Sequence, residues 1–177
     1  MIQISTHDPD SARRALISTC GLENDSVRYL LADRLDSISG RMPNLALEIH
    51  DKLAITSDSS LISVLSSALA SICAQRLEEY PSRAAHLISN GDDRSIRRLI
   101  ESGFRTYLDY DPNDEQGLLS HAWIEGDDLS KSRLKGLISE QRKISIDAFE
   151  ATLRRINTVS EREAILLREE IMSRESR

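Results

Sequence analysis

Aromatic residues, glycine and proline are scarce in this chain of 177 residues. Phe, Trp and Tyr together make up 4% of it, and it has only seven glycines and four prolines. Strands usually recruit aromatic and β-branched residues and need frequent turn residues between them. The apolar content of 40% is built mainly from Leu, Ile and Ala, which favours helices. The composition therefore argues against a many-stranded sheet.

Cysteine and long apolar runs are also rare. Cys20 and Cys73 lie in apolar helical contexts without a CxxC motif, so we interpret both as reduced core thiols. The first residues lack a basic region followed by a sustained apolar run, so no secretory signal is expected. The uncharged stretch at 59–75 is too short and too rich in serine for a membrane span. These features predict a cytoplasmic protein that does not bind membranes.

Motifs for catalysis and cofactor binding are missing. The chain has no nucleophile elbow, P-loop, dinucleotide-binding glycine motif or H-E-x-x-H zinc motif. The acidic run at 109–115 fails as a calcium loop, because Asp114 stands where glycine is needed and Ser120 where glutamate is needed. His121 and Glu125 have the spacing of metal ligands on a helix, but no third ligand is identifiable. We therefore predict no catalytic residue, cofactor or metal, and an enzyme whose site forms only in three dimensions is the third-ranked alternative.

The most informative feature that is present is the segment 59–75, which has no charged residue in a chain that is 29% charged. Its larger apolar residues recur at helical spacing, and small residues, mainly serine, cover the remaining surface. A helix that is apolar or small all round is expected to be packed on all sides. The segment therefore predicts a buried central helix in a compact all-α domain.

Capping residues and glycines indicate where the other helices begin and end. Asp8-Pro9 and Asp111-Pro112 each place a capping carboxylate before a proline at the first helical position. Ser160 and Glu163 form a capping box ahead of a C-terminal amphipathic helix within 160–177. We predict one domain over residues 1–177, with residues 1–7 as an extended arm. Its nine or ten antiparallel helices are predicted at 9–20, 25–38, 43–54, 58–79, 82–90, 93–108, 112–125, 128–142, 145–156 and 160–174.

A short repeated tripeptide is compatible with more than one arrangement of these helices. Leu-Ile-Ser occurs at 16–18, 87–89 and 137–139, and each copy is followed by a turn and a second amphipathic helix. The copies begin 71 and then 50 residues apart, so they define no strict period. Stacked helical hairpins like HEAT or armadillo repeats fit the sequence, and so does an irregular bundle around the central helix.

An apolar set of residues is the first candidate for binding, because tryptophan and methionine are enriched in interface cores. The candidate interaction residues are Trp123, Ile165, Ile171 and Met172. With no reaction centre in the sequence, they lead us to predict a non-enzymatic protein–protein interaction module that acts as an adaptor, regulator or inhibitor. Its partner would be another protein, with homo-oligomerisation as a further option.

A basic set is the second candidate, and it supports the alternative of a nucleic-acid-associated helical protein. If its segments fold together, they would form a positive stripe able to contact phosphate. The net charge of -6 and pairing with Glu140, Asp147 and Glu150 argue against nucleic-acid binding. The members of this predicted basic patch are Lys131, Arg133, Lys135, Arg142, Lys143, Arg154 and Arg155.

Overall fold

The computed structural model describes residues 9–21, 24–56 and 58–175, and every regular element in these ranges is helical. The predicted all-α fold class is confirmed. The predicted arm at 1–7 and the capping residue Asp8 lie outside the described residues. The α-helices are α1 (Pro9–Cys20), α2 (Asp25–Asp33), α3 (Leu35–Ser39), α4 (Pro43–Ala54), α5 (Ser59–Ile72), α6 (Tyr80–Asn90), α7 (Asp93–Leu99), α8 (Arg105–Tyr110), α9 (Leu118–Glu125), α10 (Asp128–Ile144), α11 (Ile146–Asn157) and α12 (Glu161–Glu175). A 3-10 turn, η1 (Leu77–Glu79), precedes α6, and a π-helical turn, η2 (Ile100–Phe104), joins α7 to α8.

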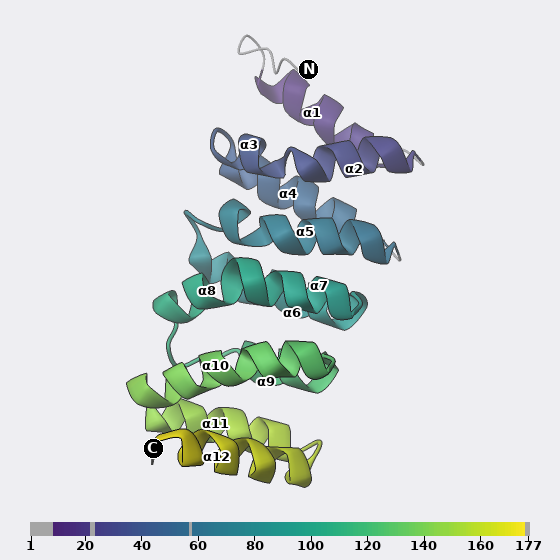
Figure 1. Cartoon of the computed structure of the whole chain (residues 1–177). Helices are drawn as coiled ribbons and strands as arrows, with labels where there is room; N and C mark the ends of the chain where they lie inside the picture. The colour runs from purple at the N-terminus through teal and green to yellow at the C-terminus, as the bar shows by residue number, and fades with distance from the viewer. Residues whose placement is uncertain (1–8, 22–23, 57, 176–177) are drawn as a thin grey trace.

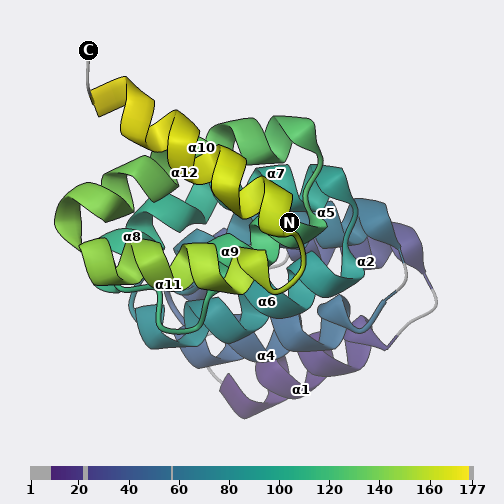
Figure 2. The same cartoon turned by 90° about the horizontal axis from the view of Figure 1, so that it is seen from below.

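The helices are stacked one pair after another from the N-terminus to the C-terminus (Figure 1). Seen from the end of the stack, they form two rows (Figure 2). We call α1, α4, α6, α9 and α11 the A row. The B row consists of α2 with α3, then α5, then α7 with η2 and α8, then α10 and α12. Each A-row helix is followed along the chain by the B-row helix beside it.

Each B-row helix that follows an A-row helix begins with a polar cap that accepts a backbone N–H from the first turn. The intervals between successive caps are 33 to 35 residues, so the helical pairs recur at a nearly constant spacing. The caps of α2, α5, α7, α10 and α12 are Asn24, Asp58, Asp92, Asp127 and Ser160.

This spacing explains why the Leu-Ile-Ser tripeptide defined no period. The copies at 16–18 and 87–89 lie on the A-row helices α1 and α6, which are two pairs apart, whereas the copy at 137–139 lies on α10 in the B row. A fourth Leu-Ile-Ser, at 61–63, lies on α5 in the B row. The copies are therefore not all equivalent. Membership of a particular repeat class, HEAT or armadillo, stays a prediction.

Helix α5 has the predicted central position, since it packs against α2, α3, α4, α6, α7 and η2. Leu65 and Leu69 have no exposed surface. The expectation that α5 is packed on all sides is wrong, because Ser60, Ser67 and Ser71 face solvent. The uncharged surface of α5 thus combines a buried apolar face with an exposed serine face.

Three predicted helices are interrupted in the structure. The predicted helix at 58–79 ends at Ile72, and the last part of that range is the 3-10 turn η1. The predicted helix at 25–38 divides at Arg34, which ends α2 and precedes α3. The predicted helix at 93–108 contains the π-helical turn η2, in which Gly103 lies against the Tyr80 ring. A Cβ atom at Gly103 would overlap the Tyr80 phenol, so this close approach requires glycine.

The prediction that Asp111-Pro112 starts a helix is wrong, because α9 begins only at Leu118. The Asp111 carboxylate instead accepts the N–H groups of Asn113 at 3.2 Å and Glu115 at 3.0 Å, which closes a tight turn. The N-cap of α9 is Gly117, and the first N–H groups of the helix are satisfied by Asp114, which is fully buried and has a left-handed φ of 49°.

The two oxygens of Asp114 accept the N–H groups of Leu118 at 2.7 Å and Leu119 at 3.0 Å. Arg155 of α11 donates hydrogen bonds to the backbone carbonyls of Asp114 and Glu115, both at 3.0 Å. Burial raises the pKa of Asp114 to about 6, although the two backbone hydrogen bonds act in the opposite direction. The acidic run at 109–115 is therefore a structural turn that fixes the start of α9.

Candidate binding groove on the A row

Three neighbouring hollows lie along the A-row surface of α1, α4 and α6. The middle hollow encloses about 480 Å³, and it shares Asn44 and Glu48 with the hollow beside α1. It shares Asp51, Ile55 and further residues with a third hollow of about 340 Å³ beside α6. We call this continuous, shallow depression the A-row groove.

The groove lies where the backbones of α4 and α6 approach each other at few points. Helix α4 packs mainly on α1, α3 and α5, whereas α6 packs on α5, α7 and α9. The groove residues of α4 and its C-cap are spaced by four, three and four, which places them along one face; they are Asn44, Glu48, Asp51 and Ile55. This polar stripe ending in an isoleucine is a sequence signal that the composition and motif analysis missed.

Side chains from η1 and α6 bridge the groove. Arg83 donates two hydrogen bonds of 2.8 Å to the two oxygens of Asp51 and a third of 2.6 Å to Glu79. Arg76 donates to Asn44 at 2.8 Å and to Glu79 at 3.0 Å. The arrangement positions α6 against α4, and it leaves the half-exposed Asp51 carboxylate at the surface.

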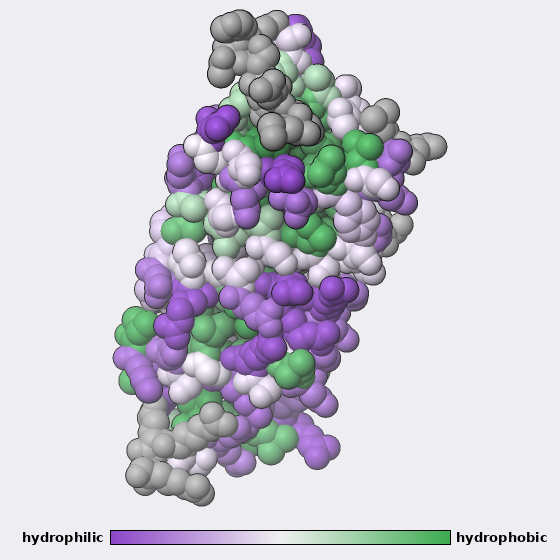
Figure 3. Space-filling view, turned by 45° about the horizontal axis from the view of Figure 1, so that its top comes forward, coloured by the Kyte–Doolittle hydropathy of each residue, from purple (hydrophilic) through white to green (hydrophobic). Residues whose placement is uncertain are grey.

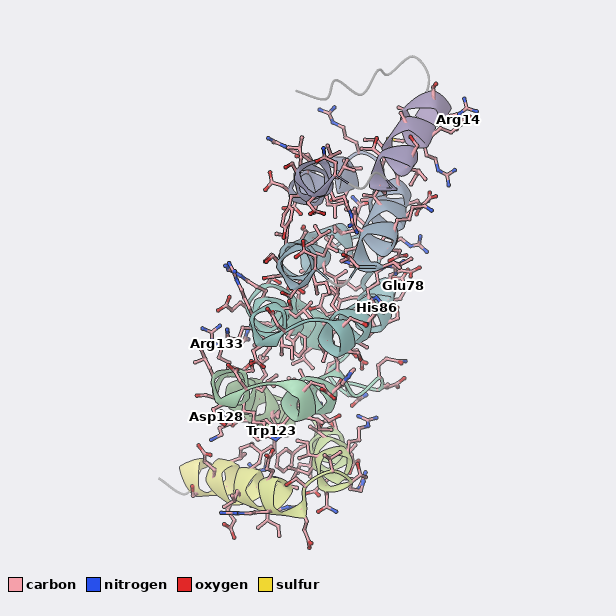
Figure 4. All side chains as sticks on the ribbon, turned by 90° about the vertical axis from the view of Figure 1, so that its right-hand side faces the viewer. Arg14, Glu78, His86, Trp123, Asp128 and Arg133 are labelled. Carbon is pink, nitrogen blue, oxygen red and sulfur yellow. The ribbon has the colours of Figure 1, made fainter. Side chains whose placement is uncertain are left out.

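His50 lies beneath this network with 1% of its surface exposed, and its Nε2 atom has no hydrogen-bond partner. Burial lowers the pKa of His50, so the imidazole is neutral near pH 7. Partial burial alone would raise the pKa of Asp51, but hydrogen bonds from His50 and Arg83 outweigh it and the pKa lies below its ordinary value. His86 contacts the Ala54 carbonyl across the groove at 3.4 Å. Figure 4 shows His86 and Glu78 on the A-row side and Arg133 and Asp128 on the opposite side.

The charges that line the groove are mixed. Arg13, Lys52, Arg76 and Arg83 are basic, and Glu48, Asp51 and Glu79 are acidic. Ile55 is the most exposed large apolar residue in the described part of the chain, at 79%. A groove with alternating charges and an apolar edge has the chemistry to contact a polypeptide, and it lacks the uniform positive potential that a nucleic-acid backbone requires.

The structure separates the predicted interaction residues into two groups. Trp123 is in the core at 4% exposure, and its Nε1–H donates a 2.7 Å hydrogen bond to Glu163. Ile171 is also in the core at 2% exposure, because it shares the inner face of α12 with Ala164 and Leu167. Ile165 and Met172 lie on the outer face of α12 and are each 47% exposed.

The predicted basic patch is divided among several local contacts. Lys131 pairs with Glu163 at 2.9 Å, Arg133 with Glu101, and Lys135 with Glu170 at 2.5 Å. Arg142 lies over the Phe149 ring, and Arg155 is bonded to the carbonyls before α9. Lys143 and Arg154 are exposed. The expected acidic partners Glu140, Asp147 and Glu150 are therefore wrong for Lys131, Arg133 and Lys135, because neighbouring helices of the stack supply their partners.

The structure also places the residues considered for metal binding and catalysis. In the described ranges, no group of three or more His, Cys, Asp or Glu residues is arranged to hold a metal ion. His121 contacts the Ser89 hydroxyl at 3.3 Å, but no carboxylate orients its ring within those ranges.

Cys20 and Cys73 are free and buried, and burial raises the pKa of the Cys73 thiol to about 12. All helices in the described ranges are too short or too polar to cross a lipid bilayer.

Comparison of the chain with known protein families, curated proteins and solved structures finds no match.

Proposed function

We propose that this protein is a non-enzymatic protein-binding module and that the A-row groove holds a segment of its partner. The observation that carries the proposal is the continuity of the groove over three successive helices, α1, α4 and α6. A groove of this form offers a long contact surface but no enclosed pocket for a small substrate. The module would act as an adaptor, regulator or inhibitor.

The chemistry of the groove supports a polypeptide as the occupant. The carboxylates of Asp51 and Glu79 retain exposed surface and could accept hydrogen bonds from the partner's N–H groups, while Lys52 could donate to its carbonyls. Ile55 provides an exposed apolar contact at the edge. Arg83 is less suited to direct binding, because it already donates to Asp51 and Glu79.

Nucleic-acid binding remains the alternative, and the ion pairs of Lys131, Arg133 and Lys135 argue against it. Each pair reduces the charge available to phosphate. A cytoplasmic location remains part of the proposal, because buried, unpaired Cys20 and Cys73 are compatible with a reducing compartment.

A crosslinking experiment tests the groove directly. A photoreactive amino acid is placed at Ile55 in the groove or at Ile146, which is 65% exposed on α11 outside it. In cells that normally make the protein, we expect the probe at Ile55 to capture a discrete partner and the probe at Ile146 not to do so.

The captured partner is then purified and titrated against defined variants. Ile55→Glu should weaken its binding by about tenfold or more, whereas Ile146→Glu should leave it unchanged. A partner that binds both variants with wild-type affinity would place the binding site elsewhere.

A further inference from the structure

The outer face of α12 is apolar at the end of the stack. Ile165, Leu166 and Met172 are 47%, 53% and 47% exposed, and Val159, just before the helix, is 65% exposed. The opposite face of α12 packs inward through buried residues. Figure 2 shows α12 nearest the viewer, with no other described element covering it.

Two charged residues complete this outer face. Arg162, Ile165, Glu169 and Met172 are spaced by three, four and three, and Leu166 lies beside them, so they form one stripe along the helix. Arg162 and Glu169 are exposed and make no ion pair with any described residue. Other charged residues of α12 are already paired within the chain: Glu163 with Lys131, and Arg168 with Glu150 at 2.5 Å. Glu161 at the start of α12 is also exposed and without an ion pair to a described residue, and within the stripe the unpaired charges are Arg162 and Glu169.

We propose that α12 is the interface of a symmetric dimer, in which the outer stripe packs antiparallel against that of a second copy of this chain. The sequence of the stripe is complementary to itself when it is reversed about the point between Ile165 and Leu166. In that register, Arg162 of each copy faces Glu169 of the other, and Ile165 faces Leu166. Met172 of each copy then lies level with the turn that carries Val159, just before α12 of the other copy.

This register selects a second copy as the occupant. Ile165 and Leu166 meet each other, and the two unpaired charges of the stripe acquire partners of opposite sign. A parallel arrangement in equal register would place Arg162 beside Arg162 and Glu169 beside Glu169. The contact involves one helix from each chain, so we expect a dimer with affinity in the micromolar range.

Sedimentation equilibrium of the full-length chain tests the dimer. The wild-type protein should change from monomer to dimer as its concentration increases through the micromolar range. Ile165→Glu should be monomeric throughout and remain fully helical, because the side chain is exposed and its loss creates no cavity. The matched control Leu30→Glu, at a similarly exposed position on α2 at the other end of the stack, should dimerise like the wild type. A wild-type protein that stays monomeric over this range would overturn the proposal, even if α12 then proved to bind a different protein.

Charge exchange tests the antiparallel register. Arg162→Glu and Glu169→Arg should each weaken self-association by about tenfold, because each homodimer then contains two like-charge contacts. An equimolar mixture of the two variants should form a heterodimer about as stable as the wild-type dimer, because both opposite-charge contacts are restored. Weak association in the mixture, equal to that of the separate variants, would overturn the register.

Discussion

The B-row surface differs between α5 and the helices that follow it. Helix α5 presents serines to solvent and packs on α7 more extensively than any other pair of described helices. Between α7, α10 and α12 the packing is sparser, and long charged side chains span the gaps, as in Arg133 with Glu101 and Lys135 with Glu170. Figure 3 shows the contrast as a pale surface toward the N-terminal end and a strongly hydrophilic band in the middle.

The comparison shows that helical pairs that recur every 33 to 35 residues can pack either through small side chains or through long ion-paired side chains. Small residues such as Ser66, which is fully buried, let two helices approach closely. Long ion-paired residues keep helices further apart and contribute little net stability at an exposed surface. Stability should therefore be concentrated around α5.

The largest effect is expected in α5 itself. Leu69→Asp should unfold the protein, because an unpaired carboxylate in this fully buried position costs several kcal/mol, comparable with a total stability of about 5–15 kcal/mol. Ser67→Asp on the exposed face of the same helix should have little effect. Circular dichroism during thermal denaturation measures both. A fully helical Leu69→Asp protein with an unchanged melting temperature would show that α5 is not the centre of stability.

Two glycine substitutions compare close and open packing. Gly103→Ala should destabilise the protein by about 1–3 kcal/mol, because the new methyl group would overlap Tyr80. Gly136→Ala in α10 should stabilise it by about 0.5–1 kcal/mol, because nothing lies within 4 Å of the added Cβ atom and alanine favours a helix. Urea denaturation gives both free energies of unfolding. Equal changes in the free energy of unfolding for the two substitutions would contradict the difference in packing between the two regions.

The turn between the two regions should also be sensitive. Asp114→Asn should cost about 1–3 kcal/mol at pH 7, because the amide nitrogen would face a backbone N–H that a carboxylate oxygen now accepts. Glu115→Gln, on an exposed neighbour, serves as the control for urea denaturation. A neutral result for Asp114→Asn would mean that another group satisfies the start of α9.

The smallest effect is expected for the ion pairs of the second region. A double-mutant cycle with Arg133→Ala and Glu101→Ala should give a coupling free energy of about 0.2–1 kcal/mol, since both side chains are more than one-third exposed. The coupling should fall further in high salt. A coupling of about 3 kcal/mol, unaffected by salt, would show that these pairs hold the helices together.

Local signals in the sequence predicted most helices well. The predicted range 43–54 coincides with α4, which begins at Pro43, and the central position of α5 followed from its lack of charge. The start of α9 was wrong because Asp111 satisfies a turn instead of a helix. The regular interval of the stack was missed because it lies in the caps, including the repeated Gly-Asp-Asp-x-Ser at 91–95 and 126–130.

The candidate binding surfaces were less accessible to sequence reasoning. The A-row groove depends on α4 and α6 facing each other across a gap, although α5 separates them in the chain. On α12, the sequence identified the apolar residues of the helix but not the direction in which each one faces. Ile171 faces inward, whereas Ile165 faces outward. Trp123 was wrongly expected at an interface, because its indole N–H donates a hydrogen bond to Glu163 within the protein.

The regular succession of capped helical pairs has a consequence for folding. Most long-range polar contacts join residues in adjacent pairs, such as Asp51 with Arg83 and Glu101 with Arg133, so closing one pair onto the next requires only a short loop of chain. Folding can then begin in the densely packed α5 region and spread outward in both directions. The amide hydrogens of α5 should exchange most slowly with solvent, and protection should decrease pair by pair toward α1 and α12.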